Sequence, residues 1–189
     1  MKNSEFITGP VPITKEEVRA IALNKLELKG KKSFVDIGAG TGSISIEAAV
    51  TYKELEVIAI EHQDQAIELI EKNKAKFELA NIKVVQGHAP IELTQKVDAI
   101  FIGGTDGSLK EIIDWSYDLL NEGGALVANF LLLDNFYEAL HLLKESLFIN
   151  VEATMLSVCK LEKLGKGEYF KPFNPIYLLS CYKEKKEDE

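Results

Sequence analysis

Three glycines at alternate positions follow a short apolar run: Gly38, Gly40 and Gly42. The residues before them, 33–37, have the composition of a short buried strand and include an acid, Asp36. The residues after them, 43–52, have the pattern of a helix. A strand, a tight glycine turn and a helix in this order let the backbone approach a nucleotide closely.

The glycine spacing and a second acid narrow the ligand class. The dinucleotide fingerprint places its third glycine one residue later, and the Gly-Lys-Ser/Thr ending of a phosphate-cradling loop is absent. A second strand is expected at 56–60 and ends at Glu61, whose carboxylate can accept ribose hydroxyl protons. These features favour a nucleoside without phosphates, of which S-adenosylmethionine is the common example. Alternatively, the glycines only form a turn and Glu61 only caps a helix.

The rest of the chain alternates predicted strands with predicted helices. Further strands are expected at 82–86, 97–102 and 125–130. Further helices are expected from Thr14 to Leu26, from Asp64 to about Leu79, from after Asp106 to about Leu120, and at 134–147. Two closing strands, 149–161 and 173–182, are separated by a polar, glycine-containing segment, 164–172. Five alternations predict an α/β fold, a parallel sheet with helices on both faces. The two closing strands must pair antiparallel.

Ligands bind such sheets at the carboxyl ends of the strands. The segments expected at this edge are 38–42, Glu61, 87–90, 103–106 and Asn129. The site is therefore predicted here.

The first helix carries two features of its own. Thr14 and Glu17 have the spacing of a capping box, and Asp64 is a comparable N-cap for a later helix. Lys15 and Arg19, the only arginine, are four residues apart and share a helix face. That face is either solvated or a clamp for substrate carboxylates.

Composition indicates one domain, 1–189, with an N-terminal segment and capping helix (1–32), a sheet core (33–182) and a tail (183–189). No apolar run approaches the roughly 20 residues of a membrane span, and no signal peptide is recognisable, so a cytoplasmic location is the default. Cys159 and Cys181 lie in apolar runs and are expected to be two buried thiols. A formal charge of −8 argues against a nucleic-acid binder.

Four segments together resemble a known family: 12–19, 36–43, 87–90 and 101–104. The chain is similar over essentially its whole length to the decarboxylating cobalt-precorrin-6B methyltransferases of cobalamin biosynthesis, within the class I S-adenosylmethionine-dependent methyltransferases. The resemblance implies a Rossmann-like fold with seven strands, mostly parallel, the last one antiparallel. It also implies methylation of carbon 15 and removal of carbon dioxide from the carbon-12 acetate, giving cobalt-precorrin-7.

The resemblance also implies roles for particular residues. Cofactor contacts are expected from Thr14, Gly38, Ala39, Gly40, Thr41, Gly42, Glu61, His88 and Ala89. Many relatives carry an acid or small polar residue where His88 stands; His88 either accepts from the adenine amino group or has no specific role. Substrate contacts are expected from Lys15, Arg19, Gly103 and Gly104, with Lys166 or Lys171 extending a positive rim. Gly103 and Gly104 either leave room for a flat tetrapyrrole or only end a strand.

The resemblance further implies a homo-oligomer, typically a tetramer. No catalytic base is identified. No metal ligands cluster in the sequence, so no protein-bound metal is expected, and any cobalt would arrive inside the substrate. The alternatives are a methyltransferase for RNA or protein and a non-catalytic nucleoside-binding assembly module.

Overall fold

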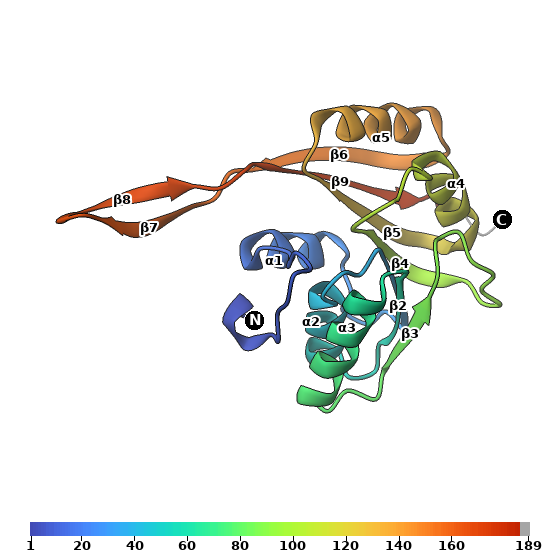
Figure 1. The fold of residues 1–189 in the computed structure, drawn as a ribbon. Helices are drawn as coiled ribbons and strands as arrows, with labels where there is room; N and C mark the ends of the chain where they lie inside the picture. Colours follow the sequence, from blue (N-terminus) through green and yellow to red (C-terminus); the bar gives the residue numbers. More distant parts are fainter. Residues whose placement is uncertain (186–189) are drawn as a thin grey trace.

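A seven-stranded sheet forms the centre of the computed structural model, which describes residues 1–185 (Figure 1). The strand order is β3-β2-β1-β4-β5-β9-β6. The strands are β1 (Ser33–Ile37), β2 (Glu56–Glu61), β3 (Ile82–Gln86), β4 (Val97–Ile102), β5 (Leu120–Phe130), β6 (Phe148–Leu156) and β9 (Ile176–Lys183). Strand β9 runs antiparallel to β5 and β6, and the other neighbouring pairs are parallel. The predicted mostly parallel sheet with an antiparallel last strand is confirmed.

Helices cover both faces of the sheet, as Figure 1 shows. Helices α1 (Glu16–Lys25), α2 (Ser43–Thr51) and α3 (Asp64–Lys76) lie on one side, and α4 (Leu109–Leu119) and α5 (Leu133–Glu145) on the other. A short 3₁₀ turn, η1 (Asn3–Glu5), precedes them. Each face has its own apolar core because successive strand residues point to opposite sides. In β1, Phe34 packs in the α1–α2 core and Val35 in the α4–α5 core.

Both predicted helix caps are wrong. The N-cap of α1 is Lys15, which makes no side-chain cap, so Thr14 lies one residue before the cap position; the Glu17 carboxylate pairs with Lys160 instead. The N-cap of α3 is Gln63, and Asp64 is already the first helical residue. In both cases tertiary partners or loop geometry override the local capping signal.

The five predicted helices are present, and the connection between β3 and β4, residues 87–96, contains no helix, as the sequence analysis also placed none there. One boundary differs: the segment 121–124, before the strand expected at 125–130, lies inside β5, where the pairing with β4 shifts register. This shift is a β-bulge-like irregularity that accommodates Gly123 and Gly124, and the strand continues beyond them.

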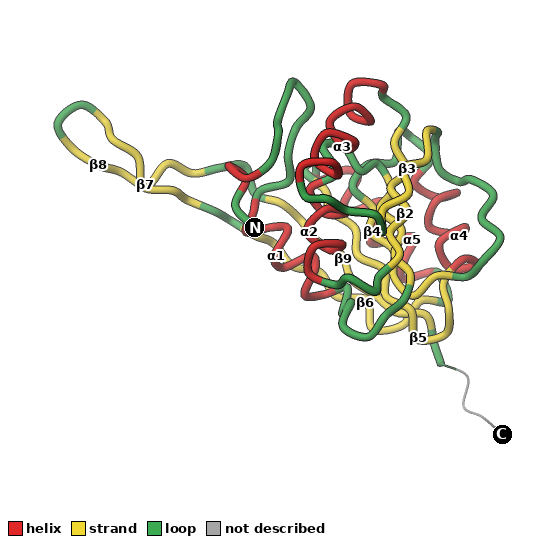
Figure 2. The backbone as a smooth tube through the Cα atoms, turned by 90° about the horizontal axis from the view of Figure 1, so that it is seen from below, coloured by secondary structure: helices red, strands yellow, loops and turns green. Residues whose placement is uncertain are grey.

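A second, two-stranded sheet projects away from the molecule (Figures 1 and 2). It consists of β7 (Cys159–Leu164) and β8 (Gly167–Pro172). The sequence analysis placed part of β7 in one long strand and took 164–172 as a loop. Cys159 lies on this hairpin and is exposed, so the prediction of a buried thiol is wrong for Cys159; Cys181 is buried in β9, and both are free.

The end of the chain is partly described. Lys183, placed in the tail by the sequence analysis, is the last residue of β9. Residues 186–189 of that predicted tail lie outside the described residues. Within the described part of the chain, no helix has the length and apolar character needed to traverse a membrane.

Candidate functional site

A cavity of about 590 Å³ lies at the carboxyl ends of the parallel strands. Its walls are 11–15, 36–41, 60–63, 87–89, 103–106, Asn129 and the residues Phe173, Asn174 and Ile176. Each of the edge segments singled out in the sequence reaches this cavity. The sheet brings them together because parallel strands end at one edge.

The glycine turn brings two backbones into direct contact. A Cβ on Gly38 would lie 2.7 Å from the Gly104 nitrogen, and φ at Gly38 is +65°. The Gly38 and Ala39 N–H groups donate to the Ile60 carbonyl, at 2.9 and 3.1 Å. A Cβ on Gly40, in contrast, would meet nothing closer than 3.7 Å. Gly38 is therefore required by packing, whereas Gly40 is favoured by its backbone conformation, with φ at +56°, and lines the cavity without a side chain.

Glu61 is a buried carboxylate at the end of β2. Its Oε2 accepts from the Gly40 N–H at 2.9 Å, and its Oε1 accepts from the N–H groups of His62 and Gln63 at 2.8 and 2.9 Å. Three donors on about four acceptor positions leave roughly one position free. The carboxylate is thus held rigidly at the cavity, and it can accept one ribose hydroxyl without giving up a bond.

Asp36 is the second buried acid on the cavity wall. Its Oδ2 accepts from the Ser45 hydroxyl at 2.6 Å and the Ser45 N–H at 3.2 Å, while its Oδ1 has no partner. Burial raises the pKa of Asp36 to about 7, although the hydrogen bonds from Ser45 oppose the rise and the charge of Glu61 adds to it. An unpartnered buried carboxylate oxygen favours a cationic ligand nearby.

Lys15 lies on the cavity wall, as a substrate contact requires. Its Nζ donates to the Asn174 carbonyl at 2.7 Å and lies 5.4 Å from the centre of the Phe173 ring. The residues Lys166 and Lys171 lie on the hairpin and do not line the cavity. Lys171 pairs with Glu162 at 3.0 Å.

Arg19 does not share the surface of Lys15, and the prediction of an exposed clamp is corrected. Its side chain is 0% exposed. The guanidinium pairs with Glu47 and donates to Asn3 Oδ1 and to the carbonyls of Thr14 and Met1. All of these partners except Glu47 belong to the N-terminal segment, so Arg19 fixes that segment from inside.

The N-terminal segment has a second anchor, which sequence reasoning missed. Asn73 is fully buried in α3; its amide donates to the Ile7 carbonyl at 3.0 Å and accepts from the Ile7 N–H at 2.7 Å. An asparagine inside a helix is an unfavourable helix residue, and that was the available signal. Together these contacts hold residues 11–15 over the cavity.

Gly103 and Gly104 have different environments. A Cβ on Gly103 would lie 3.0 Å from the Gly38 carbonyl oxygen and 3.3 Å from the Phe101 ring. A Cβ on Gly104 would meet only the Gly38 Cα, at 3.9 Å. Close packing therefore explains why residue 103 is glycine. Of the two, only Gly104 can serve to leave room for a ligand at the cavity.

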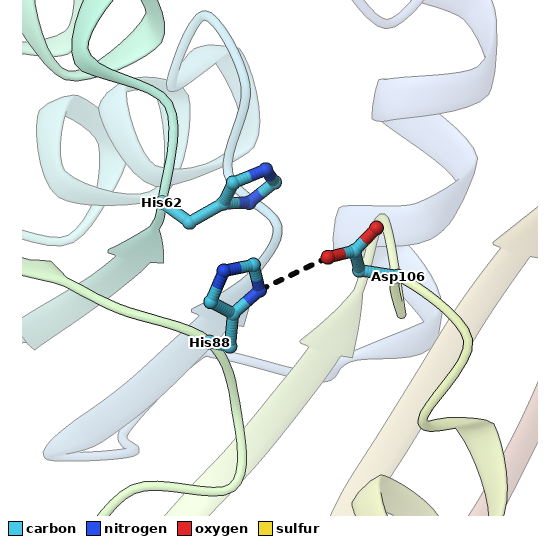
Figure 3. Close-up of side chains that lie close together, drawn as sticks. All are labelled: His62, His88 and Asp106. Atoms are coloured by element: carbon cyan, nitrogen blue, oxygen red, sulfur yellow. Dashed lines mark ion pairs between the residues drawn. The ribbon is translucent and has the colours of Figure 1, made fainter.

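Two histidines and an aspartate meet at the cavity rim (Figure 3). His88 was expected here, whereas His62 and Asp106 were not singled out, although each directly adjoins or ends an edge segment. The expectation that no metal ligands cluster is corrected, because three loops bring these side chains together. The remaining expected residues, Thr14, Ala39, Thr41 and Ala89, also line the cavity, and Gly42 opens α2.

Comparison with known proteins decides the family. A profile described as "Precorrin methyltransferase domain" matches residues 7–183. The chain is 44% identical over 185 residues to the cobalt-precorrin-6B C(15)-methyltransferase (decarboxylating) of Salmonella typhimurium, covering 97% of this chain and 96% of that protein. The chain belongs to the precorrin methyltransferase family.

Solved structures of precorrin methyltransferases and a decarboxylase share the fold. The precorrin-6Y C5,15-methyltransferase from Geobacter metallireducens has a TM-score of 0.90 and 35% identity, covering 97% of this chain and 96% of its own. The precorrin 8W decarboxylase of Methanobacterium thermoautotrophicum has a TM-score of 0.87 and 30% identity, covering 96% and 98%. The class I methyltransferase fold predicted from the sequence is confirmed.

Proposed function

We propose that this precorrin methyltransferase methylates carbon 15 of cobalt-precorrin-6B and removes carbon dioxide from the carbon-12 acetate. The observation that carries the proposal is 44% identity, over nearly the whole of both chains, to a protein of that name. The cavity at the sheet edge supports the methyl-donor half of the proposal, because its volume suits one small-molecule ligand.

The cavity residues fit S-adenosylmethionine as the methyl donor. Glu61 offers one acceptor position for a ribose hydroxyl. Gly40 leaves the room that a side chain would fill. The unpartnered Oδ1 of Asp36 suits a cationic group, and this ligand carries two.

The protein's part in the reaction is to bind and orient. When bound, S-adenosylmethionine supplies an electrophilic methyl group. Holding the donor and an acceptor carbon in line can contribute about 7–11 kcal/mol. The conjugated macrocycle can act as the carbon nucleophile and accept the electrons released with carbon dioxide, so no dedicated protein base is required.

Substrate recognition is assigned to the rim around Lys15 and Gly104. The Lys15 ammonium lies on the cavity wall and can exchange the Asn174 carbonyl for a substrate carboxylate. Gly104 keeps the end of β4 free of a side chain. Arg19 is excluded from this role because its donors are occupied in the interior.

We infer that the chain forms a homo-oligomer through the β7–β8 hairpin. Pairing places Leu161 opposite Phe170, and alternation puts both on one face with Cys159 and Pro172, while the charged pair Lys163 and Glu168 lies on this face at the tip of the hairpin. The opposite face carries Lys160, Glu162 and Lys171 together with Tyr169 and Leu164. Leu161 is 55% and Phe170 68% exposed. A two-stranded hairpin is marginal alone, and a second copy of the same apolar face would cover it.

The competing functions have less support. A methyltransferase for RNA usually needs a basic surface, whereas the chain has a formal charge of −8. A non-catalytic nucleoside-binding module would keep the geometry of Glu61 and the glycine turn, so these residues do not separate it from an enzyme. The 44% identity to a protein named as a methyltransferase favours catalysis instead.

Mass spectrometry of the tetrapyrrole tests the function directly. Incubation of cobalt-precorrin-6B with S-adenosylmethionine and the protein should add one methylene unit and remove one carbon dioxide.

Glu61→Gln should weaken S-adenosylhomocysteine binding by about tenfold or more, since it loses a charge-assisted hydrogen bond. Glu145→Gln, an exposed acid on α5, is the matched control and should bind normally. Cofactor binding without any change in the tetrapyrrole would contradict the proposed substrate.

A further inference from the structure

The side chains of His62, His88 and Asp106 converge from three different loops at the cavity rim (Figure 3). They follow strands β2, β3 and β4, respectively. His88 Nδ1 lies 3.1 Å from Asp106 Oδ2, and the two imidazole rings stack with centroids 4.3 Å apart. One ligand atom from each residue lies within 4.8 Å of the others. Neither the fold nor the proposed methyl transfer requires this arrangement.

Two imidazoles and a carboxylate are a donor set for divalent transition metals such as zinc, nickel or cobalt. Zinc binds nitrogen and oxygen at about 2.0–2.2 Å, so two ligand atoms on one tetrahedral ion lie about 3.3 Å apart. The His88–Asp106 separation, 3.1 Å, is close to this value. His62 must rotate toward the pair, which its 35% exposed side chain permits without disturbing the core.

A buried carboxylate stands behind His62. Glu61 Oε1 lies 3.4 Å from His62 Nδ1 and is held by two backbone N–H groups. At this separation the two atoms form no hydrogen bond, but rotation of the His62 ring would let Glu61 accept from one ring nitrogen and leave the other free to ligate, which is the usual support of a metal-bound histidine. Glu61 and Asp106 also place negative charge on both sides of the cluster.

We propose that His62, His88 and Asp106 bind a divalent transition-metal ion, and that the bound ion and the nucleoside of the methyl donor exclude each other. The three residues and Glu61 line the same cavity, and Glu61 Oε1 lies 3.4 Å from His62 Nδ1, so an ion bound here occupies the space beside the proposed ribose acceptor. The exclusion rests on the proposed function; the metal site itself does not.

Zinc titration of the tag-free protein tests the site. Calorimetry at about pH 7.5, where ligands must be deprotonated to bind, should show one saturable zinc ion per chain. His88→Ala and Asp106→Asn should each weaken binding by more than about tenfold. His141→Ala is the matched control, because His141 faces Glu145 on α5 without a second histidine. Absence of saturable binding, or equal binding by His88→Ala, would overturn the proposal.

A competition experiment tests the exclusion. In the wild-type protein, saturating zinc should raise the dissociation constant of S-adenosylhomocysteine by about tenfold or more, and chelation should restore it. Unchanged affinity with zinc bound would overturn the exclusion. Failure of zinc-free protein to bind S-adenosylhomocysteine would instead contradict the proposed function, while the zinc titration would still decide the metal site.

Discussion

At the scale of single residues, the cavity wall contains two buried acids that differ in how completely their oxygens are hydrogen-bonded. Glu61 accepts three backbone N–H groups and is thereby fixed in place. Asp36 keeps one oxygen without a partner inside the protein. Burying a carboxylate in this way disfavours its charged form, so the site holds an ionisable group that a cationic ligand would stabilise.

Replacing Asp36 with asparagine should remove one pH dependence of stability. An unfolded aspartate has a pKa of about 3.9, whereas burial raises the pKa of Asp36 to about 7. Between these values the folded chain holds a proton that the unfolded chain lacks. The contribution of Asp36 to stability is therefore complete below about pH 4 and is lost as the pH rises to about 7.

Chemical denaturation across that pH window measures this effect. The free energy of unfolding of the wild type, relative to Asp36→Asn, should fall with pH by at most about 1.4 kcal/mol per unit. The difference should level off above about pH 7, once both states are ionised. Parallel profiles for the two proteins would show that Asp36 titrates normally.

At the scale of elements, the N-terminal segment is the part of the site that local sequence patterns describe least well. Arg19 in α1 and Asn73 in α3 hold its backbone from two sides. Residues 11–15 then form one wall of the cavity. The pattern correctly predicted a helix containing Arg19, whereas Lys15 is its N-cap. It could not show that one side chain points inward and the other lies at the rim.

Arg19→Met and Lys15→Met should therefore behave differently. Removing the Arg19 guanidinium leaves the largely buried Glu47 with only the N-terminal ammonium as an ionic partner and should cost at most about 3–5 kcal/mol of stability. It should also weaken cofactor and substrate together, because the wall loosens. Lys15→Met should leave stability nearly unchanged and raise only the Michaelis constant of the tetrapyrrole. Denaturation curves and the two Michaelis constants distinguish these outcomes. If Arg19→Met has the stability of the wild type, the structural role of Arg19 is contradicted and its role as a clamp for substrate carboxylates is favoured again.

At the scale of the whole molecule, the projecting hairpin is the feature least explained by a single chain. Its two strands pair with each other and extend away from the rest of the chain (Figure 2). Leu161 and Phe170 on its apolar face are both exposed. Its connection to β9 passes through Phe173 and Asn174, which line the cavity. Assembly through the hairpin would thus also steady one wall of the site.

Phe170→Glu should dissociate the proposed oligomer, since it places a charge on the apolar face. Tyr169→Glu is the matched control, because the neighbouring aromatic lies on the opposite face. Light scattering after size-exclusion chromatography measures the mass of each protein. A thiol reagent gives a second readout: Cys159 on the apolar face should react faster in Phe170→Glu, while buried Cys181 stays protected. A monomeric wild type would contradict this assembly.

The sequence by itself determined the sheet, its ligand-binding edge and the family. These follow from short-range features: apolar strand runs, helical periodicity, and glycines at 38, 40 and 42 before an acid-ending second strand. Only the tertiary structure showed that Arg19 is buried and that His62, His88 and Asp106 lie together. It also showed that Gly103 is closely packed, whereas Gly104 is not. Each depends on contacts between segments far apart in sequence, and local patterns do not encode which neighbour arrives there.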